Sequence, residues 1–211
     1  MIRLFRGTGQ SQLSNDTRSK YLFYMLGEIA LVVVGILIAL QINNWNDERK
    51  ITADKKKTLL LIKKEIMANQ SLVKRTSDYH EMVRDTLTKI EIPKDEEATK
   101  EAFQFWRGLQ IFRLRNSAFQ TAVQAGITKE LDIKLSERLN AMYTLQDAYN
   151  DFSSTASQGL YNLDFSSTDS YGSIATFISM VMTDLYYFEK ELMMMFDDSL
   201  MELETLEKTL K

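Results

Sequence analysis

The residues of this chain that could do chemistry are few, and that scarcity limits the reactions open to it. Among 211 residues there is no Cys and a single His, His80. Without thiols the chain forms no disulfide, no thiolate metal site and no Cys nucleophile. His80 follows Ser77 by three residues, whereas the Glu-x-x-His pairs of di-iron bundles need a carboxylate there. His80 is therefore interpreted as a packed residue of the core or of an interface.

Known catalytic motifs are also missing from the sequence. We find no zinc-protease, serine-hydrolase, phosphate-loop or dinucleotide-binding pattern. Asp197 and Asp198 follow a run of methionines, but adjacent carboxylates point to different helix faces, which favours solvated surface over a metal site. We expect no catalytic residues, no metal ligands, no cofactor and no enzyme activity. A net charge of −3 also gives no general attraction to nucleic acid, so none is expected as a partner.

One carboxylate stands out because it lies inside an apolar run. Residues 21–42 read YLFYMLGEIALVVVGILIALQI, with only Glu28 charged. As a helix this run covers roughly 33 Å, which matches a hydrocarbon core of about 30 Å. Tyr21 and Tyr24 at one end and Trp45 at the other are expected to anchor at the interfaces. A cleaved signal peptide is the alternative, but its apolar region would be shorter. The sequence predicts one transmembrane helix.

The face of this helix that carries Glu28 also carries small residues. Helical spacing places Val32, Gly35 and Ala39 beside Glu28. Gly35 and Ala39 form a small-xxx-small pair, which lets two helices approach closely. A carboxylate in lipid is costly unless it is protonated, paired or near the interface. We expect a packed interface with a second copy or a membrane-protein partner. A snorkelling Glu28, or a proton relay through it, are the alternatives.

The charges around the span give its orientation. Residues 1–20 form a short basic leader, in which Arg18 and Lys20 adjoin the span, whereas the first charges beyond it are Asp47 and Glu48. Positive residues close to the membrane favour the cytoplasmic side, although the total counts on the two sides are nearly equal. The leader is therefore predicted to be cytoplasmic and residues 43–211 extracytoplasmic.

A basic cluster follows the span. Lys55, Lys56 and Lys57 lie a short way beyond the predicted membrane, where they are candidate contacts for anionic lipid headgroups. A solvated helix face is the alternative interpretation.

The region around the span resembles a known family. The stretch SKYLFYMLGEIALVVVGILIALQINNWNDER is similar to the N-terminal signature of short single-pass inner-membrane proteins of Gram-negative bacteria, a family defined only as a domain of unknown function. The matching positions are Lys20–Tyr21, Gly27–Glu28, Gly35–Gln41 and Asn43–Asn46. A weaker match covers Arg115–Gly126. The resemblance implies membrane anchoring and a helical fold, and it implies no activity, cofactor or catalytic residues.

The rest of the chain predicts an all-α fold. One Pro and eight Gly in the whole sequence are too few for the turns of a sheet protein. From residue 59 apolar positions recur in alternating steps of three and four, which is a coiled-coil or bundle seam, until Pro93 ends the helix. We expect the transmembrane helix to continue into an antiparallel helical bundle. Its helices are predicted over residues 47–91, 95–112, 117–125, 129–163 and 173–209.

Two details of this bundle are predicted from single residues. Ser117 and Gln120 have the spacing of a capping box for the third of these helices. The polar seam members Asn69, Thr76 and His80 are expected either inside a core closed by one chain or at an interface between chains, where they would set the register.

For function, the sequence favours a structural or interaction protein that acts through protein–protein contacts and self-associates in the membrane. The first alternative is an accessory subunit of an ion-driven motor or transporter that uses Glu28. The second alternative is a ligand-binding sensor bundle without an output domain of its own.

Overall fold

The computed structural model describes residues 13–91, 93, 95–167 and 170–209. Residues 1–12 of the predicted basic leader lie outside the described residues. All regular elements in the described ranges are helical and none is a strand, which confirms the all-α fold class. The chain divides into two compact units, Met1–Ala53 and Asp54–Lys211.

Helix α1, Leu13–Leu87, contributes to both units. It is unbroken because no Pro precedes Pro93 and no Gly lies between Gly35 and Gly108. The polar residues after the apolar run do not interrupt it, since Asn43 Nδ2 donates to Asp47 Oδ2 at 3.1 Å, one turn away. Within the described residues α1 is the one helix with a segment long and apolar enough to cross a membrane.

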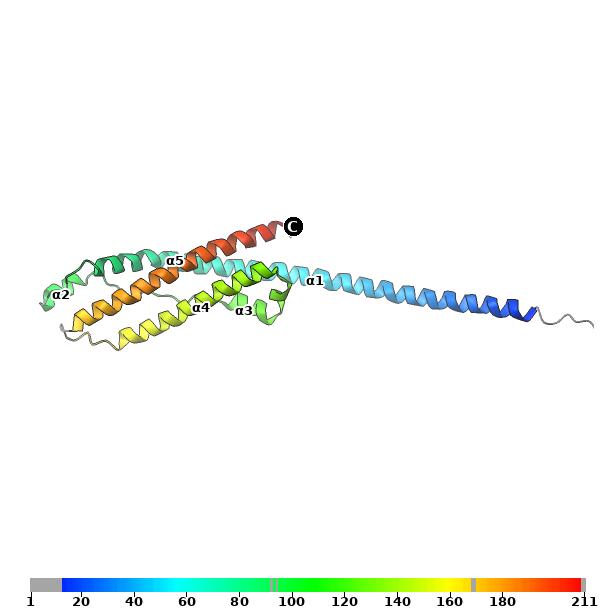
Figure 1. The fold of residues 1–211 in the computed structure, drawn as a ribbon, viewed down its shortest axis with the longest axis horizontal. Coiled ribbons are helices and arrows are strands. Elements are labelled where there is room, and N and C mark those ends of the chain that lie inside the picture. The colour runs from blue at the N-terminus through cyan, green and yellow to red at the C-terminus, as the bar shows by residue number, and fades with distance from the viewer. Residues whose placement is uncertain (1–12, 92, 94, 168–169, 210–211) are drawn as a thin grey trace, which may run out of the picture. The chain divides into compact units, whose positions relative to one another are not determined.

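The second unit packs the later part of α1 against two other long helices, α4, Ile133–Tyr161, and α5, Tyr171–Thr209. In Figure 1, α4 and α5 lie side by side and run in opposite directions. Lys63 of α1 contacts Glu204 of α5, and His80 contacts Glu189. The residue numbers rise along α1 and fall along α5, so these two helices are also antiparallel.

Helices α1 and α4 run parallel. Glu65 bonds to Tyr143 and Asn69 bonds to Gln146, so the numbers rise along both helices. A parallel pair needs a connection that returns the chain to its starting end. Residues 88–132 make that return. They contain α2, Glu96–Ala102, then residues 103–116, which form no regular element and which we call the extended stretch, then α3, Ser117–Gln124, and the short 3-10 helix η1, Ile127–Glu130.

The predicted seam of α1 is buried inside this one unit. Ile62, Ile66 and Val83 are inaccessible to solvent, and burying each such side chain stabilises the fold by about 2 kcal/mol. The polar seam members are buried in the same core. Facing residues from α4 and α5 that are equally buried are Leu135, Leu139, Met142, Ile178, Leu185, Leu192 and Phe196. The core is therefore closed by a single chain.

The predicted helix over 95–112 is wrong beyond Ala102. Phe103 ends α2, and no regular element follows until Ser117. Gly108 and Gln110 have φ values of 83° and 48°, which lie outside the right-handed helical region. The next predicted helix, 129–163, is shorter than expected, because α4 begins at Ile133, where the Asp132 side chain accepts from Lys134 N.

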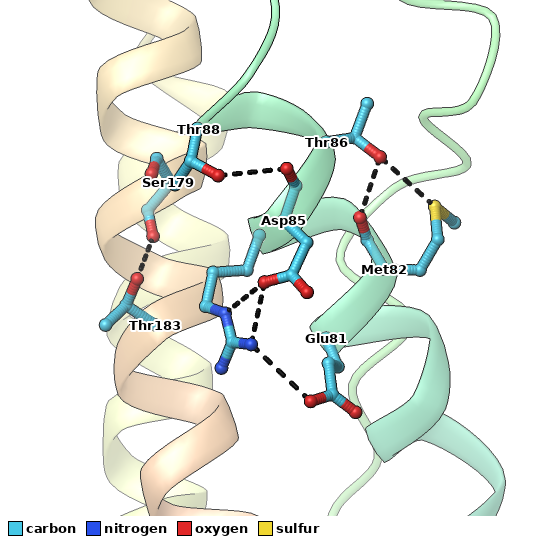
Figure 2. Close-up of polar contacts among 8 residues, drawn as sticks. Glu81, Met82, Asp85, Thr86, Thr88, Ser179 and Thr183 are labelled. Carbon is cyan, nitrogen blue, oxygen red and sulfur yellow. Dashed lines mark hydrogen bonds and ion pairs between the residues drawn. The ribbon is translucent and has the colours of Figure 1, made fainter.

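Helix α1 also ends earlier than expected, at Leu87 and not at residue 91. Figure 2 shows the Thr88 hydroxyl directed at the backbone oxygen of Asp85, to which it donates at 2.9 Å. Arg84 donates to the Asp85 carboxylate at 2.7 Å and lies 4.0 Å over the ring of Tyr186 on α5. The last turn of α1 is therefore closed by its own side chains and attached to α5.

Candidate functional site

The most connected polar group in the bundle is the carboxylate of Glu189 on α5. It is 1% exposed, and its Oε1 accepts from His80 Nδ1 at 2.8 Å, Thr76 Oγ1 at 3.2 Å and Tyr149 OH at 3.3 Å. Its other oxygen, Oε2, has no hydrogen-bond partner among the described residues. The donors come from α1 and α4, so a single carboxylate oxygen connects the three long helices. We call these four residues the Glu189 cluster.

His80 extends the Glu189 cluster to the stretch between α2 and α3. Its ring is fully buried, and Nε2 lies 2.7 Å from the Leu109 carbonyl oxygen. Because a carbonyl only accepts, Nε2 carries a hydrogen, and a second hydrogen lies between Nδ1 and the Glu189 oxygen. Both ring nitrogens are thus engaged in structural bonds. The prediction that His80 is a packed residue is confirmed.

Side-chain amides hold the extended stretch in place. They bond to its backbone N–H and carbonyl groups, as a neighbouring strand would in a sheet. Asn150 accepts from Leu114 N at 2.9 Å and donates to Leu114 O at 3.0 Å. Asn69 makes the same pair of bonds to Arg115, at 3.0 and 2.7 Å. Gln146 adds a donation to Arg115 O at 2.8 Å. These bonds satisfy backbone groups that a helix would have satisfied internally.

Helix α3 is capped from outside, by Glu65 of α1. The Glu65 carboxylate accepts from Ala118 N at 2.9 Å, Phe119 N at 3.4 Å and Ser117 Oγ at 3.0 Å. A negative charge is favourable at a helix N-terminus, where amide groups lack partners. The predicted capping box at Ser117 is wrong, because its hydroxyl donates to Glu65. The N-cap, Asn116, makes no side-chain cap bond.

Two buried tyrosines sit against these carboxylates. Tyr143 OH donates to Glu65 at 2.9 Å, and Tyr149 OH donates to Glu189. Burial raises the pKa of both hydroxyls, and the negative charge of the neighbouring carboxylate raises it further. Both tyrosines therefore act as protonated donors throughout the physiological range.

Neither carboxylate was singled out from the sequence. Glu189 lies four residues after Leu185 and three before Leu192, in phase with the core face of α5, and Glu65 lies three residues after Ile62. The sequence signal that could have identified them is an acidic residue at a position where the helical pattern expects an apolar one. Asn150 and Gln146 had no such signal, because amides are common at helix surfaces.

The predicted membrane-face residues all lie on α1, in the first unit. Glu28, Val32, Gly35 and Ala39 are exposed, and nothing lies within 4 Å of the position that a Gly35 side chain would take. Whether they pack against a partner stays a prediction.

The predicted interfacial anchors are exposed as well. Tyr21 is 73% exposed, Tyr24 82% and Trp45 58%, and Arg49 lies 5.0 Å from the Trp45 ring. Their role as anchors remains a prediction.

The basic cluster is divided by the structure. Lys55 Nζ donates to the backbone oxygen of Glu130 in η1, whereas Lys56 and Lys57 are exposed. Lys55 is thus already used in joining α1 to η1. Contact of the three lysines with lipid headgroups stays a prediction.

Surface grooves beside the extended stretch are small. One of about 180 Å³ is lined by Phe112, Asn150 and Ser154, and one of about 380 Å³ by Leu61, Lys64 and Arg115. Ligand pockets are commonly ~300–1,000 Å³, so the first is too small and the second is at the lower limit. Among the described residues no group of three His, Cys, Asp or Glu side chains is arranged to hold a metal ion.

Comparison of the chain with protein-family models, with curated proteins and with solved structures gives no match in any of the three.

The Glu189 cluster predicts a large and specific loss of stability. We expect Glu189→Ala to lower the free energy of unfolding by about 3 kcal/mol, because it leaves the buried donors of His80 and Tyr149 without this acceptor. Glu189→Gln should cost less, since its carbonyl oxygen still accepts. Glu137→Gln, at an exposed position of α4, is the matched control. Denaturant titration followed by circular dichroism measures all three, and an Ala variant as stable as the control contradicts the assignment.

The buried tyrosines predict how stability depends on pH. Since their folded-state pKa values are raised, the unfolded chain ionises first, near the ordinary tyrosine pKa of about 10. The free energy of unfolding should therefore hold up to about pH 10 and then fall by about 1.4 kcal/mol per pH unit for each tyrosine. Tyr143→Phe and Tyr149→Phe should each remove one such contribution. Tyr161→Phe, at an 87% exposed residue, should not. Equal slopes in all three variants would refute this.

Proposed function

We propose that this protein is a membrane-anchored helical-bundle protein that acts through protein–protein contacts and carries out no catalysis of its own. The observation that carries the proposal is the uncovered apolar segment of α1: none of its most apolar window is buried by the chain. A continuous apolar surface of this size is not stable in water and needs lipid around it. On the sequence pattern we place the protein in a bacterial inner membrane, with the bundle in the periplasm.

The bundle interior supports an interaction role over a catalytic one. Both ring nitrogens of His80 are bonded, and the carboxylates of Glu65 and Glu189 accept from buried donors. Groups used in this way are not available to a substrate. They give the bundle a fixed shape, and a fixed shape is what a binding module needs.

The membrane segment supports self-association or a membrane-protein partner. Gly35 has open space beside it, and together with Ala39 it offers a surface on which a second helix can pack closely. The alternative, an accessory subunit of an ion-driven motor or transporter, is favoured by one observation, the single carboxylate of Glu28 inside the apolar run. In that case Glu28→Gln would abolish the biological effect while leaving the complex intact.

Membrane anchoring by residues 21–42 is tested by placing charge in the apolar segment. We expect the full chain to stay with bacterial membranes after an alkaline wash. A variant with Val33→Arg and Leu37→Arg should be released, because each Arg at the centre of a span costs about 3 kcal/mol. A variant with Asn140→Arg and Ser154→Arg, at exposed positions of α4, is the control. If the first variant stays in the washed membranes to the same extent as the control, the proposal is wrong.

A further inference from the structure

Helix α5 carries an apolar stripe that its own chain leaves uncovered. Met180, Tyr187, Met194 and Met201 recur every seven residues and are 64%, 63%, 57% and 68% exposed. Single exposed apolar residues need no explanation, but four in heptad register form a seam of the kind on which another helix packs. We call these four residues the α5 stripe.

The neighbouring rows of α5 show that the stripe faces outward. Asp197 accepts from Gln70 of α1 at 2.6 Å, and Asp198 pairs with Arg138 of α4 at 3.4 Å. The stripe lies between these two rows on the surface of α5. Asp184 and Glu191 border it and are exposed, and within the described part of the chain neither has a hydrogen bond or ion pair. The face is therefore apolar along its centre and acidic along the edge that carries Asp184 and Glu191, while Lys190 lies on the other edge.

A face of opposite charge lies on α1 in the same compact unit. Leu60 and Met67, seven residues apart, are 44% and 53% exposed. Lys57, Lys64 and Lys74 lie on the same helical face and are exposed, with no ion-pair partner within the described ranges. The next row along the helix, with Lys63, pairs with Glu204 of α5. We call these five residues the α1 basic face.

We propose that the α1 basic face of one copy docks on the α5 stripe of a second copy. Contact between the two faces buries apolar side chains that are otherwise in water and brings free lysines to free carboxylates. Pairing of either face with itself would place like charges together, which disfavours it. A reciprocal contact, in which each copy contributes both faces, closes into a two-fold dimer, whereas a contact that uses one face of each copy builds rings or open rows.

This inference rests on the proposed self-association but places a contact in the bundle, separate from the membrane segment. The two are distinguishable by mutation. Gly35→Leu disturbs the membrane face, and Ala30→Leu makes the same change on the opposite side of the helix. Equal behaviour of these two variants argues against membrane packing and says nothing against the bundle contact.

Charge reversal tests the bundle contact in full-length chains held in lipid vesicles. The α1 variant carries Lys57→Glu and Lys64→Glu, and the α5 variant carries Asp184→Lys and Glu191→Lys. The chain has no Cys, so crosslinking is read between Met67→Cys in one population and Met194→Cys in a second, differently tagged population.

Unmodified faces should give crosslinked pairs that join position 67 of one population to position 194 of the other. Each reversed variant mixed only with itself should lose roughly tenfold in crosslinking yield, because it sets acid against acid or base against base. Mixing the α1 variant with the α5 variant should restore the yield, because their reversed faces are complementary. Restoration also shows that both variants are folded.

Several results would overturn the proposal. Crosslinking restricted to 67–67 or 194–194 pairs would mean that like faces meet, and failure of the mixed variants to recover would mean that charge complementarity plays no part. If lysine reversal lowers binding to anionic vesicles while the 67–194 yield does not move, the α1 basic face binds lipid headgroups instead of a second copy.

Discussion

A buried carboxylate needs hydrogen-bond donors, and the helices of the bundle supply them to Glu189. Its bonded oxygen, Oε1, accepts hydrogen bonds from residues of α1 and α4. The other ring nitrogen of His80 is hydrogen-bonded to the carbonyl oxygen of Leu109. Removing a charge from water costs several kcal/mol unless it is paired and hydrogen-bonded. The pairing exists only when the three long helices and the extended stretch are assembled together. The cluster therefore selects one register of α1 against α5 among those that apolar packing alone would allow.

This internal closure decides where other molecules can bind. The polar seam residues Asn69, Thr76 and His80 are satisfied within one chain, so they are not left to set a register between chains. The surfaces that remain for the proposed partners are those that the chain leaves uncovered. These are the apolar segment of α1 and the outer faces of the bundle, where the methionines of the α5 stripe stand in water.

The long helices could be predicted from the sequence because their signals are local. Apolar periodicity, the scarcity of Gly and Pro, and Pro93 after the first seam are all read within a short window. The stretch after Ala102 could not be predicted, because its conformation depends on Asn69 and Asn150, which are distant in the sequence. Gly108 was the one local sign of a break. The capping of α3 by Glu65 was missed for the same reason, since the acid comes from another helix and the local Ser117 gave a competing signal.

The membrane interpretation depends on the length and apolarity of one segment, whereas the packing of the bundle depends on contacts between distant residues. Residues 21–42 were recognised by length and apolarity alone, and the structure adds that the chain does not cover them. The family resemblance of this segment has no counterpart in the comparisons with known proteins. What the structure adds is how the bundle closes: Glu65, Asn69 and His80 are bonded within one chain, and the exterior carries two faces of opposite charge.

The closed polar core is tested most directly by nuclear magnetic resonance of the single imidazole, since His80 is the one histidine of the chain. With ring nitrogens labelled, two ring N–H signals that exchange slowly with water are expected, one for the bond to Leu109 and one for the bond to Glu189. The second signal should change in Glu189→Gln, and the first should remain. A ring that exchanges rapidly with solvent, or that gives the same spectrum in the Gln variant, would contradict the account.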